Sequence, residues 1–307
     1  MTFALGTIPL GTTVSPEDSF AILDRFIEAG GTMLDTANNY PFWNEGCTGD
    51  ESEATIGAWL AARGNRDRVF LSTKGGARPT VPGDRTLASA EGVTGKALRP
   101  AIEGSLKRLG VDHVDLYWTH VEDRQTPLED TLEALDEFHR TGKILKAGSS
   151  NMPAWRVEQA RGVSRAHGWL PYTHLQLRFT YLQPRPGALL REMGHKLATA
   201  ETLGYVQHAP DLTLWAYNTL MFGSYTNPAK PIDPAYDHAG TTERLKVLHE
   251  VAAELGATVN QVVLAWHQRQ GIVPIVGVTR MEQLEEAIGA TRIELDDELF
   301  ARLEDPA

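Results

Sequence analysis

Short runs of apolar residues alternate along the chain with longer stretches in which apolar residues recur every three or four positions. The short runs have the length of buried β-strands, and the longer stretches have the period of helices that bury one face. The runs predict strands at residues 3–8, 31–35, 69–74, 113–119, 144–149, 173–177, 212–217 and 272–276. Eight strands alternating with helices predict an α/β fold, a single (β/α)8 TIM barrel.

Capping signals mark the start of several helical stretches. Ser15 and Pro16 precede one of them, and Thr126 and Pro127 precede another, as expected where a hydroxyl accepts from a free amide and proline occupies the first turn. No linker rich in proline, glycine or serine interrupts the alternation. We therefore expect residues 1–307 to form one domain.

Three predicted connections are long for a barrel, at residues 38–50, 75–95 and 220–240. All three follow strands, so they are predicted to be long loops on the C-terminal face, where barrel enzymes have their active sites. The third contains several proline, tyrosine and asparagine residues, including Tyr225 and Tyr236. This composition favours a lid or a substrate wall, with a disordered segment as the alternative.

Composition and charge exclude several classes of partner. A net charge of -11 opposes binding to nucleic acid and to anionic membrane surfaces. Cys47 is the only cysteine, which excludes an internal disulfide and fits a reducing compartment. The sequence has neither a signal-peptide pattern nor a long apolar run, so we expect a cytoplasmic protein. His174, His208 and His267 lack the spacing of metal ligands, and no metal site is predicted.

Four chemically active side chains follow three consecutive strands. Asp35 ends the second predicted strand, Lys74 ends the third, and His120 follows the fourth. Tyr40 lies five residues after Asp35, in the loop above the second strand. Consecutive strands are neighbours in a barrel, so we expect these side chains to converge. Taken singly, the aspartate could be a cap, and the lysine or tyrosine a solvated surface residue.

This set of side chains suits the reduction of a carbonyl by hydride, because the developing alkoxide needs a proton. An ammonium about 4 Å from a phenol, at an effective dielectric near 20, favours the phenolate by about 4 kcal/mol. Lys74 is therefore expected to lower the pKa of Tyr40 toward neutrality, while Asp35 holds the ammonium. His120 would orient the carbonyl by donating a hydrogen bond.

The sequence resembles the aldo-keto reductase family over nearly its whole length. The matching stretches are residues 33–37 followed by Tyr40, 52–53 with 56–57, 71–74, 114–117 with His120, and 148–151. In that family the catalytic tetrad is Asp, Tyr, Lys and His, and it matches Asp35, Tyr40, Lys74 and His120. The resemblance implies an NADPH-dependent oxidoreductase that acts on a small-molecule carbonyl substrate.

The resemblance also implies residues that bind NADPH. Ser150, Asn151 and Gln176 match positions that bind the nicotinamide amide, and Tyr217 matches an aromatic residue that stacks on the nicotinamide ring. The pyrophosphate is expected to contact Asn218, Thr219 and Leu220. The adenosine 2′-phosphate is expected at a loop and helix start that include Gly277, Thr279, Arg280, Gln283 and Glu286. The sequence lacks the Gly-x-Gly-x-x-Gly pattern of a Rossmann phosphate site.

The chain departs from the family pattern in several places. Ala287 stands where members often have an asparagine that contacts the adenine. The N-terminal hairpin and the long C-terminal loop of some members are not seen here, so we expect an open substrate pocket. Phe42, Trp43 and Trp118 are candidates to line that pocket, with core packing or loop anchoring as the alternative. Such a pocket suits a bulky carbonyl, for instance a keto-sugar or a polycyclic ketone.

Two other functions compete with catalysis by an NADPH-dependent reductase. One is a regulatory or sensing barrel that binds NADPH, as the potassium-channel beta subunits of this superfamily do. The presence of His120 favours catalysis over that alternative. The other is a metal-dependent barrel hydrolase, which the lack of a His-x-His pair after an early strand argues against. The sequence does not predict an oligomeric state.

Overall fold

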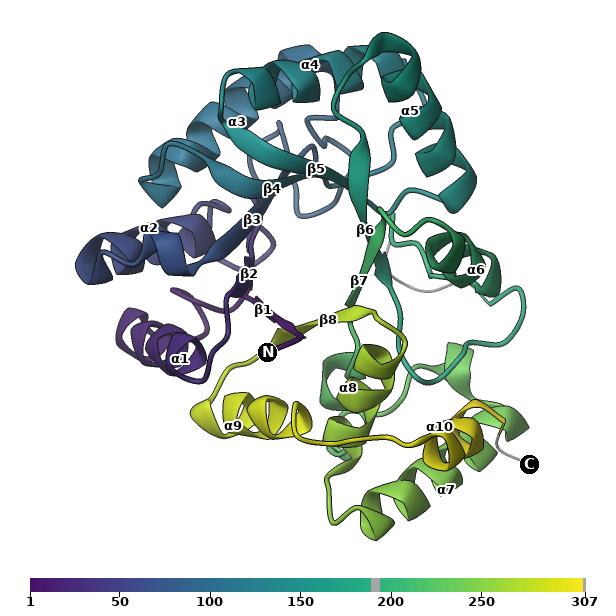
Figure 1. The fold of residues 1–307 in the computed structure, drawn as a ribbon. Helices are drawn as coiled ribbons and strands as arrows, with labels where there is room; N and C mark the ends of the chain where they lie inside the picture. Colours follow the sequence, from purple (N-terminus) through teal and green to yellow (C-terminus); the bar gives the residue numbers. More distant parts are fainter. Residues whose placement is uncertain (189–193, 306–307) are drawn as a thin grey trace.

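The computed structural model describes residues 1–188 and 194–305. Its parallel strands close into one barrel in sequence order, with β1 paired to both β2 and β8, and helices surround the barrel (Figure 1). The strands are β1 (Ala4–Gly6), β2 (Met33–Asp35), β3 (Phe70–Gly75), β4 (Val114–Thr119), β5 (Ile144–Ser150), β6 (Tyr172–Arg178), β7 (Thr213–Tyr217) and β8 (Val273–Gly277). The predicted (β/α)8 barrel is confirmed.

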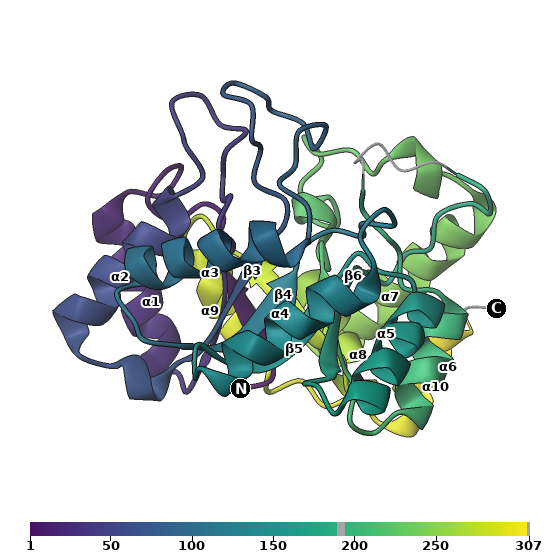
Figure 2. The same cartoon turned by 90° about the horizontal axis from the view of Figure 1, so that it is seen from above.

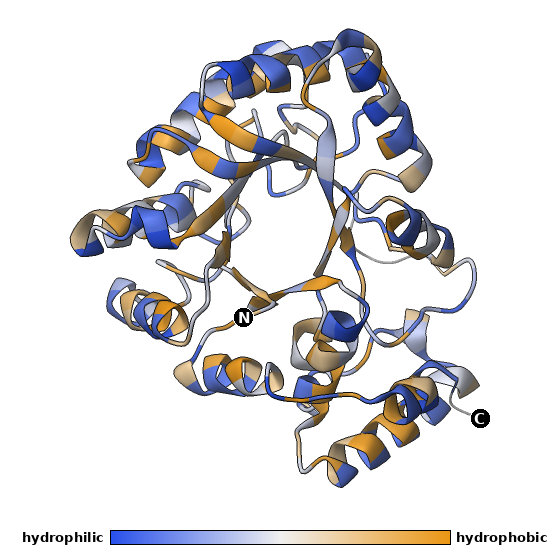
Figure 3. Ribbon diagram, viewed as in Figure 1, coloured by the Kyte–Doolittle hydropathy of each residue, from blue (hydrophilic) through white to orange (hydrophobic). Residues whose placement is uncertain are grey.

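The helices on the outside follow the predicted helical stretches. They are α1 (Pro16–Glu28), α2 (Glu51–Arg63), α3 (Gly95–Leu109), α4 (Leu128–Arg140), α5 (Ala154–His167), α6 (Ala200–His208), α7 (Ala239–Glu254), α8 (Val259–Arg269), α9 (Met281–Ala290) and α10 (Asp297–Glu304), with short 3-10 helices η1 (Arg66–Arg68), η2 (Met221–Gly223) and η3 (Pro234–Tyr236). The helices carry both hydrophobic and hydrophilic residues, as expected for elements with one buried side (Figure 3). Among residues 1–188 and 194–305, none of the helices has the length and apolar character needed to cross a membrane.

The first helix shows how local sequence sets these boundaries. The Ser15 side chain accepts a hydrogen bond of 3.1 Å from the amide of Asp18 and so caps α1. At the other end of the helix, the Gly31 amide donates to the carbonyl of Phe26. A Cβ at Gly31 would lie 2.4 Å from the Phe26 ring, so glycine is required there. Gly31 therefore belongs to the turn after α1, and β2 begins later than the sequence predicts.

The barrel interior is apolar below the active site and polar at the C-terminal ends of the strands. Trp118 pairs in register with both Lys74 and Gly148, so these three positions face the same side of the sheet. Trp118 is fully buried, and its ring packs edge-on against Trp215 with the centroids 5.5 Å apart. A Cβ at position 148 would lie 2.5 Å from that indole. Trp118 therefore packs in the barrel core, which favours the core-packing alternative over a place in the substrate pocket.

The long loops project from one end of the barrel. Figure 2 shows the segments that follow β2 and β3 rising together on that side. The loop after β7 is ordered rather than disordered, since it contains η2 and η3, and Tyr225 is buried. The Tyr225 hydroxyl lies 2.7 Å from that of Thr180 and accepts from the amide of Leu182. This loop is therefore fixed against the segment that follows β6.

Candidate active site

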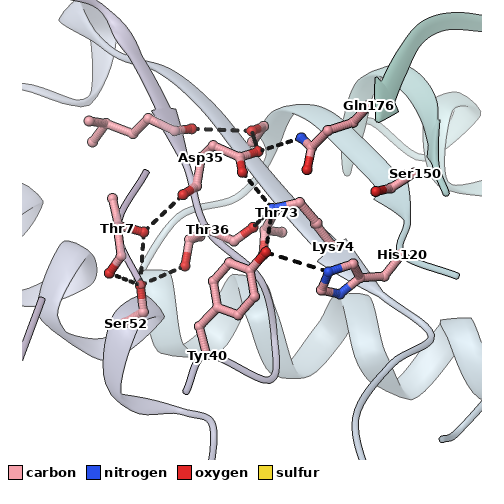
Figure 4. Close-up of polar contacts among 12 residues, drawn as sticks. Thr7, Asp35, Thr36, Tyr40, Ser52, Thr73, Lys74, His120, Ser150 and Gln176 are labelled. Carbon is pink, nitrogen blue, oxygen red and sulfur yellow. Dashed lines mark hydrogen bonds and ion pairs between the residues drawn. The ribbon is translucent and has the colours of Figure 1, made fainter. Parts of the chain in front are cut away.

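The structure brings the four predicted tetrad residues together where β2, β3 and β4 end (Figure 4). Lys74 donates a hydrogen bond of 2.5 Å to Asp35 Oδ2 and one of 3.2 Å to the hydroxyl of Tyr40. The same hydroxyl lies 3.5 Å from Nε2 of His120. An acid, an ammonium, a phenol and an imidazole thus form one continuous set of contacts.

Lys74 is fully buried but well paired. Its ammonium also donates to the carbonyl of Thr36 at 2.8 Å, in addition to Asp35 and Tyr40. Burial alone lowers the pKa of Lys74, but the Asp35 carboxylate and the Tyr40 phenol outweigh burial, and the net pKa is raised. The lysine is therefore a fixed positive charge at neutral pH.

Asp35 accepts hydrogen bonds from three directions. Ser72 Oγ donates to its Oδ1 at 2.8 Å, Gln176 Nε2 donates to the same atom at 3.2 Å, and Lys74 donates to Oδ2. A carboxylate with donors on both oxygens is held in one orientation. Ser72 was not predicted from the sequence, although it lies two residues before Lys74 and so faces the same side of β3.

The pKa of Tyr40 differs from the sequence-based expectation. Burial raises the pKa of Tyr40, the Lys74 ammonium lowers it, and the Asp35 carboxylate raises it again, so that the net pKa is raised. The expectation that Lys74 brings the phenol toward neutrality is therefore wrong for this arrangement. Tyr40 keeps its proton at neutral pH, which is the state required of a proton donor.

His120 is a neutral imidazole. Burial lowers its pKa well below the usual range, and the positive charge of Lys74 lowers it further. A neutral imidazole carries one N–H, and which nitrogen holds it depends on the hydrogen bonds of the ring. Within the part of the chain that the structure describes, Nδ1 of His120 has no hydrogen-bond partner. The ring can therefore place its single N–H on the side of Tyr40.

Asn151 connects the ends of three strands. Its backbone is left-handed, with φ of 59°. Its Nδ2 donates to the carbonyl of His120 at 3.1 Å, and its Oδ1 accepts from the hydroxyl of Tyr217 at 2.7 Å and from the amide of Lys196. Both ends of the Asn151 side chain are thus already paired within the protein. Of the predicted amide-binding residues, Ser150 retains a hydroxyl hydrogen, because it accepts only from Asn151.

The residues after β7 carry unpaired polar atoms. Asn218 has φ of 57°, and neither its Oδ1 nor its Nδ2 has a hydrogen-bond partner in residues 1–188 and 194–305. Thr219 is buried, and its hydroxyl donates to the carbonyl of Ile275 at 3.4 Å. The partly buried Leu220 packs against the core next to them. Buried polar atoms such as these need a further hydrogen-bond partner, which a polar ligand or a water molecule can supply.

The loop and helix after β8 form the predicted phosphate region. Arg280 precedes α9 as its N-cap residue, and its side chain is 68% exposed, with Glu282 at 3.9 Å. Gln283 accepts from the amide and the hydroxyl of Thr279 at 2.7 and 3.1 Å. Gly277, the last residue of β8, lies beside Gly6 in the sheet. A helix N-terminus with an exposed guanidinium suits an anion.

Two residues on α9 have their contacts within the protein. Glu286 accepts from the hydroxyl of Thr258 at 2.6 Å and from Nδ2 of Asn260 at 3.2 Å, so its carboxylate holds α9 against the start of α8. Ala287 is buried on the same helix. Glu286 thus has a structural role between α8 and α9.

The loop after β2 places aromatic rings beside Tyr40. The Trp43 ring packs edge-on against the rings of Tyr40, at 5.9 Å, and Phe42, at 5.2 Å. Trp43 is 38% exposed, whereas Phe42 is buried. Trp43 can therefore contact a molecule next to Tyr40, and the buried Phe42 ring packs against its indole.

Two further residues near the site were missed in the sequence. Arg178 ends β6, pairs in register with Tyr217 and is buried. His195 packs edge-on against Tyr217 at 5.2 Å, and burial together with the charge of Arg178 lowers the pKa of His195 to about 4. The alternation along β6 places Arg178 on the same face as Gln176, a signal that was available. No local pattern pointed to His195.

In residues 1–188 and 194–305, no group of three or more histidine, cysteine, aspartate or glutamate side chains has the arrangement of a metal site.

Comparisons with known proteins identify the family of this chain. The family model described as Aldo/keto reductase family matches residues 2–306. Norsolorinic acid reductase stcV of Emericella nidulans is 32% identical over 300 residues, which are 95% of this chain and 72% of that protein. The uncharacterized oxidoreductase YrpG of Bacillus subtilis is 31% identical over 306 residues, 98% of this chain and 90% of that one.

A solved structure shows the same fold. The crystal structure of a thermostable aldo-keto reductase in complex with the inhibitor epalrestat superposes with a TM-score of 0.76 at 26% sequence identity, covering 99% of this chain and 94% of that chain. The barrel, the grouped tetrad and the match over residues 2–306 lead to one conclusion: this chain is an oxidoreductase that belongs to the aldo/keto reductase family.

Proposed function

We propose that the protein is an NADPH-dependent reductase of aldehydes or ketones, with Tyr40 as the proton donor. The observation that carries this proposal is the hydrogen bond of 3.2 Å from the buried Lys74 ammonium to the Tyr40 hydroxyl. A phenol that holds its proton in the resting state, next to a fixed positive charge, is equipped to release that proton as charge develops on a neighbouring oxygen.

The residues of the barrel mouth fit a nicotinamide cofactor. The Ser150 hydroxyl can bind a carboxamide, and the Tyr217 ring offers a face for stacking. The two amide atoms of the partly buried Asn218, which have no partner among the described residues, can bind the polar bridge of a dinucleotide. The exposed Arg280 at the start of α9 suits a 2′-phosphate and supports NADPH as the cofactor. When bound, NADPH supplies the hydride that reduces the carbonyl carbon.

Each tetrad residue has a separate task in the proposed mechanism. As the carbonyl oxygen becomes negative, the Tyr40 hydroxyl donates its proton to that oxygen, and the phenolate that remains is stabilised by Lys74. Asp35 keeps the ammonium in place through a contact of 2.5 Å. The neutral His120 donates its single N–H toward the same carbonyl oxygen and so orients the substrate.

Trp43 and the names of relatives support a bulky carbonyl substrate. The half-exposed indole of Trp43 lies directly beside Tyr40 and offers a flat apolar surface. Relatives of this chain include the norsolorinic acid reductase of Emericella nidulans and an aryl-alcohol dehydrogenase of Pestalotiopsis microspora, the latter 29% identical over 296 residues. We therefore propose a bulky carbonyl compound, such as a polycyclic ketone or a keto-sugar, as the substrate. The proposed location of the reaction is the cytoplasm.

The test is to follow NADPH oxidation by its absorbance with a panel of aldehydes, ketones and keto-sugars. We expect turnover of at least one bulky aromatic carbonyl, and loss of that turnover in Tyr40→Phe. Tight binding of NADPH with no turnover on the whole panel would instead support a regulatory or sensing barrel.

A further inference from the structure

The loop that carries Tyr40 is closed at its base. This loop, residues 38–50, leaves the end of β2 and returns at the start of α2. Gly49 has φ of 95°, and a Cβ there would lie 2.9 Å from the Cα of Asn39, so the two ends of the loop touch. Only glycine permits this approach. The proton donor, Trp43 and Cys47 all lie between these touching ends.

One guanidinium contacts both ends of this loop. Arg78 Nη1 donates to the carbonyl of Asn38 at 2.8 Å, at the first end. The same nitrogen lies 2.5 Å from Asp50 Oδ1, and Nη2 donates to the carbonyl of Thr48 at 3.2 Å, both at the second end. The planar guanidinium has five donors in a fixed arrangement, which allows one side chain to bridge these separate acceptors.

Arg78 lies on the segment that also carries Lys74. It follows β3 by three residues, and the first end of the loop is tied to the same segment by further contacts. The amide of Asn38 donates to the carbonyl of Lys74 at 3.0 Å, and the Asn39 side chain donates to the carbonyl of Ala77 at 3.1 Å. Contacts between these two loops, outside the tetrad itself, therefore help to set the position of Tyr40 relative to Lys74.

Glu91 reinforces the first end from the far side of the β3–α3 loop. Its Oε1 accepts from Nδ2 of Asn38 at 2.8 Å and from the amide of Gly76 at 2.7 Å. Within the described residues, Arg78 makes the side-chain contacts that join the second end to the β3–α3 loop, and Asp50 is also paired with Arg108 on α3, at 3.3 Å. Removal of Arg78 should thus loosen the second end from the β3–α3 loop, with Asp50 left to its pair with Arg108, while Asn38 stays attached.

We propose that Arg78 is a positioning residue for the reaction: its guanidinium closes the loop of residues 38–50 and thereby keeps the Tyr40 hydroxyl at the Lys74 ammonium. This inference rests on the proposed function, in which Tyr40 donates the proton. A displacement of about 1 Å of a reacting group can cost about 10²-fold in rate, so a loop clamp outside the tetrad can control turnover.

The test compares Arg78→Ala with Arg85→Ala, which removes an exposed arginine from the same β3–α3 loop. For Arg78→Ala we expect kcat to fall by roughly 10- to 100-fold with the dissociation constant for NADPH unchanged. Cys47, the only cysteine, reports on the same loop. Its reaction with an aromatic disulfide reagent should become at least about threefold faster, because opening the loop exposes the thiol. Arg85→Ala should change none of these quantities.

Melting curves of each variant, followed by circular dichroism, show whether it folds. Should Arg78→Ala fail to fold, Asp50→Asn is used instead, because it weakens the contact between Arg78 and residue 50. We expect a smaller fall in kcat and a smaller increase in the reaction rate of Cys47 for this variant. An unchanged kcat in a folded Arg78→Ala protein overturns the inference, whether or not Cys47 reacts faster. Tyr40→Phe, assayed in parallel, separates the two proposals: full activity of that variant would refute Tyr40 as donor, whereas its loss together with an unaffected Arg78→Ala refutes only the clamp.

Discussion

The ammonium of Lys74 donates a hydrogen bond of 3.2 Å to the hydroxyl of Tyr40 and lies 4.8 Å from the centre of the Tyr40 ring. The positive charge therefore faces both the oxygen and the ring of the same phenol. Burial nevertheless leaves the pKa of Tyr40 raised. The ammonium is thus most useful when the proton leaves, since only then does the phenol oxygen become negative.

Replacement of Tyr40 by phenylalanine should separate binding from chemistry. We expect kcat to fall by a factor of roughly 10² to 10⁴, the usual worth of a positioned general acid. The dissociation constant for NADPH, measured by quenching of tryptophan fluorescence, should stay nearly constant, because the proposed cofactor contacts do not involve the phenol. Wild-type turnover of the best substrate by the purified variant would show that another group donates the proton.

Lys74→Met should reduce kcat by a comparable factor. Because the ammonium acts through the phenol, combining Lys74→Met with Tyr40→Phe should add little to either single loss, and the double-mutant cycle should show strong coupling. Removing Lys74 also leaves the buried Asp35 carboxylate without its ion pair, so the stability of each variant is measured by urea unfolding. Losses that simply multiply would mean that lysine and tyrosine act independently.

Arg280→Ala should narrow the preference for NADPH over NADH. A guanidinium can hold a 2′-phosphate through two hydrogen bonds, whereas the 2′-hydroxyl of NADH offers little. The matched control is Arg292→Ala, an exposed arginine just after the same helix α9. Titration of both cofactors gives the ratio of dissociation constants. The same ratio in wild type and Arg280→Ala would place the phosphate contact elsewhere.

Stability should fall as the solution is acidified, in part through His174. Burial and the charge of Lys146 lower the pKa of His174 to about 4. The unfolded chain takes up a proton at this histidine below pH of about 6.5, while the folded protein resists until about 4. The stabilisation is therefore complete above the unfolded pKa and is lost as the pH falls through the folded pKa.

Between pH 7 and pH 5 this single group should cost roughly 2 kcal/mol of the free energy of unfolding. Urea unfolding of His174→Gln at both pH values should show a smaller loss than wild type, and His208→Gln, at an exposed position at the end of α6, should behave like wild type. Equal losses in all three proteins would contradict the assignment.

The sequence predicted the barrel and the grouping of the tetrad, because both depend on local patterns. Apolar runs mark strands, and the ends of consecutive strands meet in a barrel. These two rules were sufficient to predict that Asp35, Lys74 and His120 lie close together. The order of β1 to β8 around the barrel followed from the same rule.

The burial of individual side chains and the contacts between residues far apart in sequence could not be predicted from these local patterns. Alternation places Trp118 on the inner face of β4 but does not tell that Gly148 on β5 makes room for its indole. The direction in which the pKa of Tyr40 shifts depends on how deeply the phenol is buried, and burial is known only from the folded structure. The contacts of Arg78 with both ends of a neighbouring loop depend on backbone geometry that residue types do not encode locally.

The pairing of β1 with β8 also bears on how the chain folds. Residues Ala4 to Gly6 pair with Ile275 to Gly277, so the first and the last strand of the barrel are in contact although most of the sequence lies between them. Contacts between residues so far apart in sequence form slowly, because a long loop must close first. During synthesis on the ribosome, β1 emerges first and waits for its second partner until β8 has been made. Until then the incomplete sheet has two open edges, and open edges are sites where strands of other chains can pair.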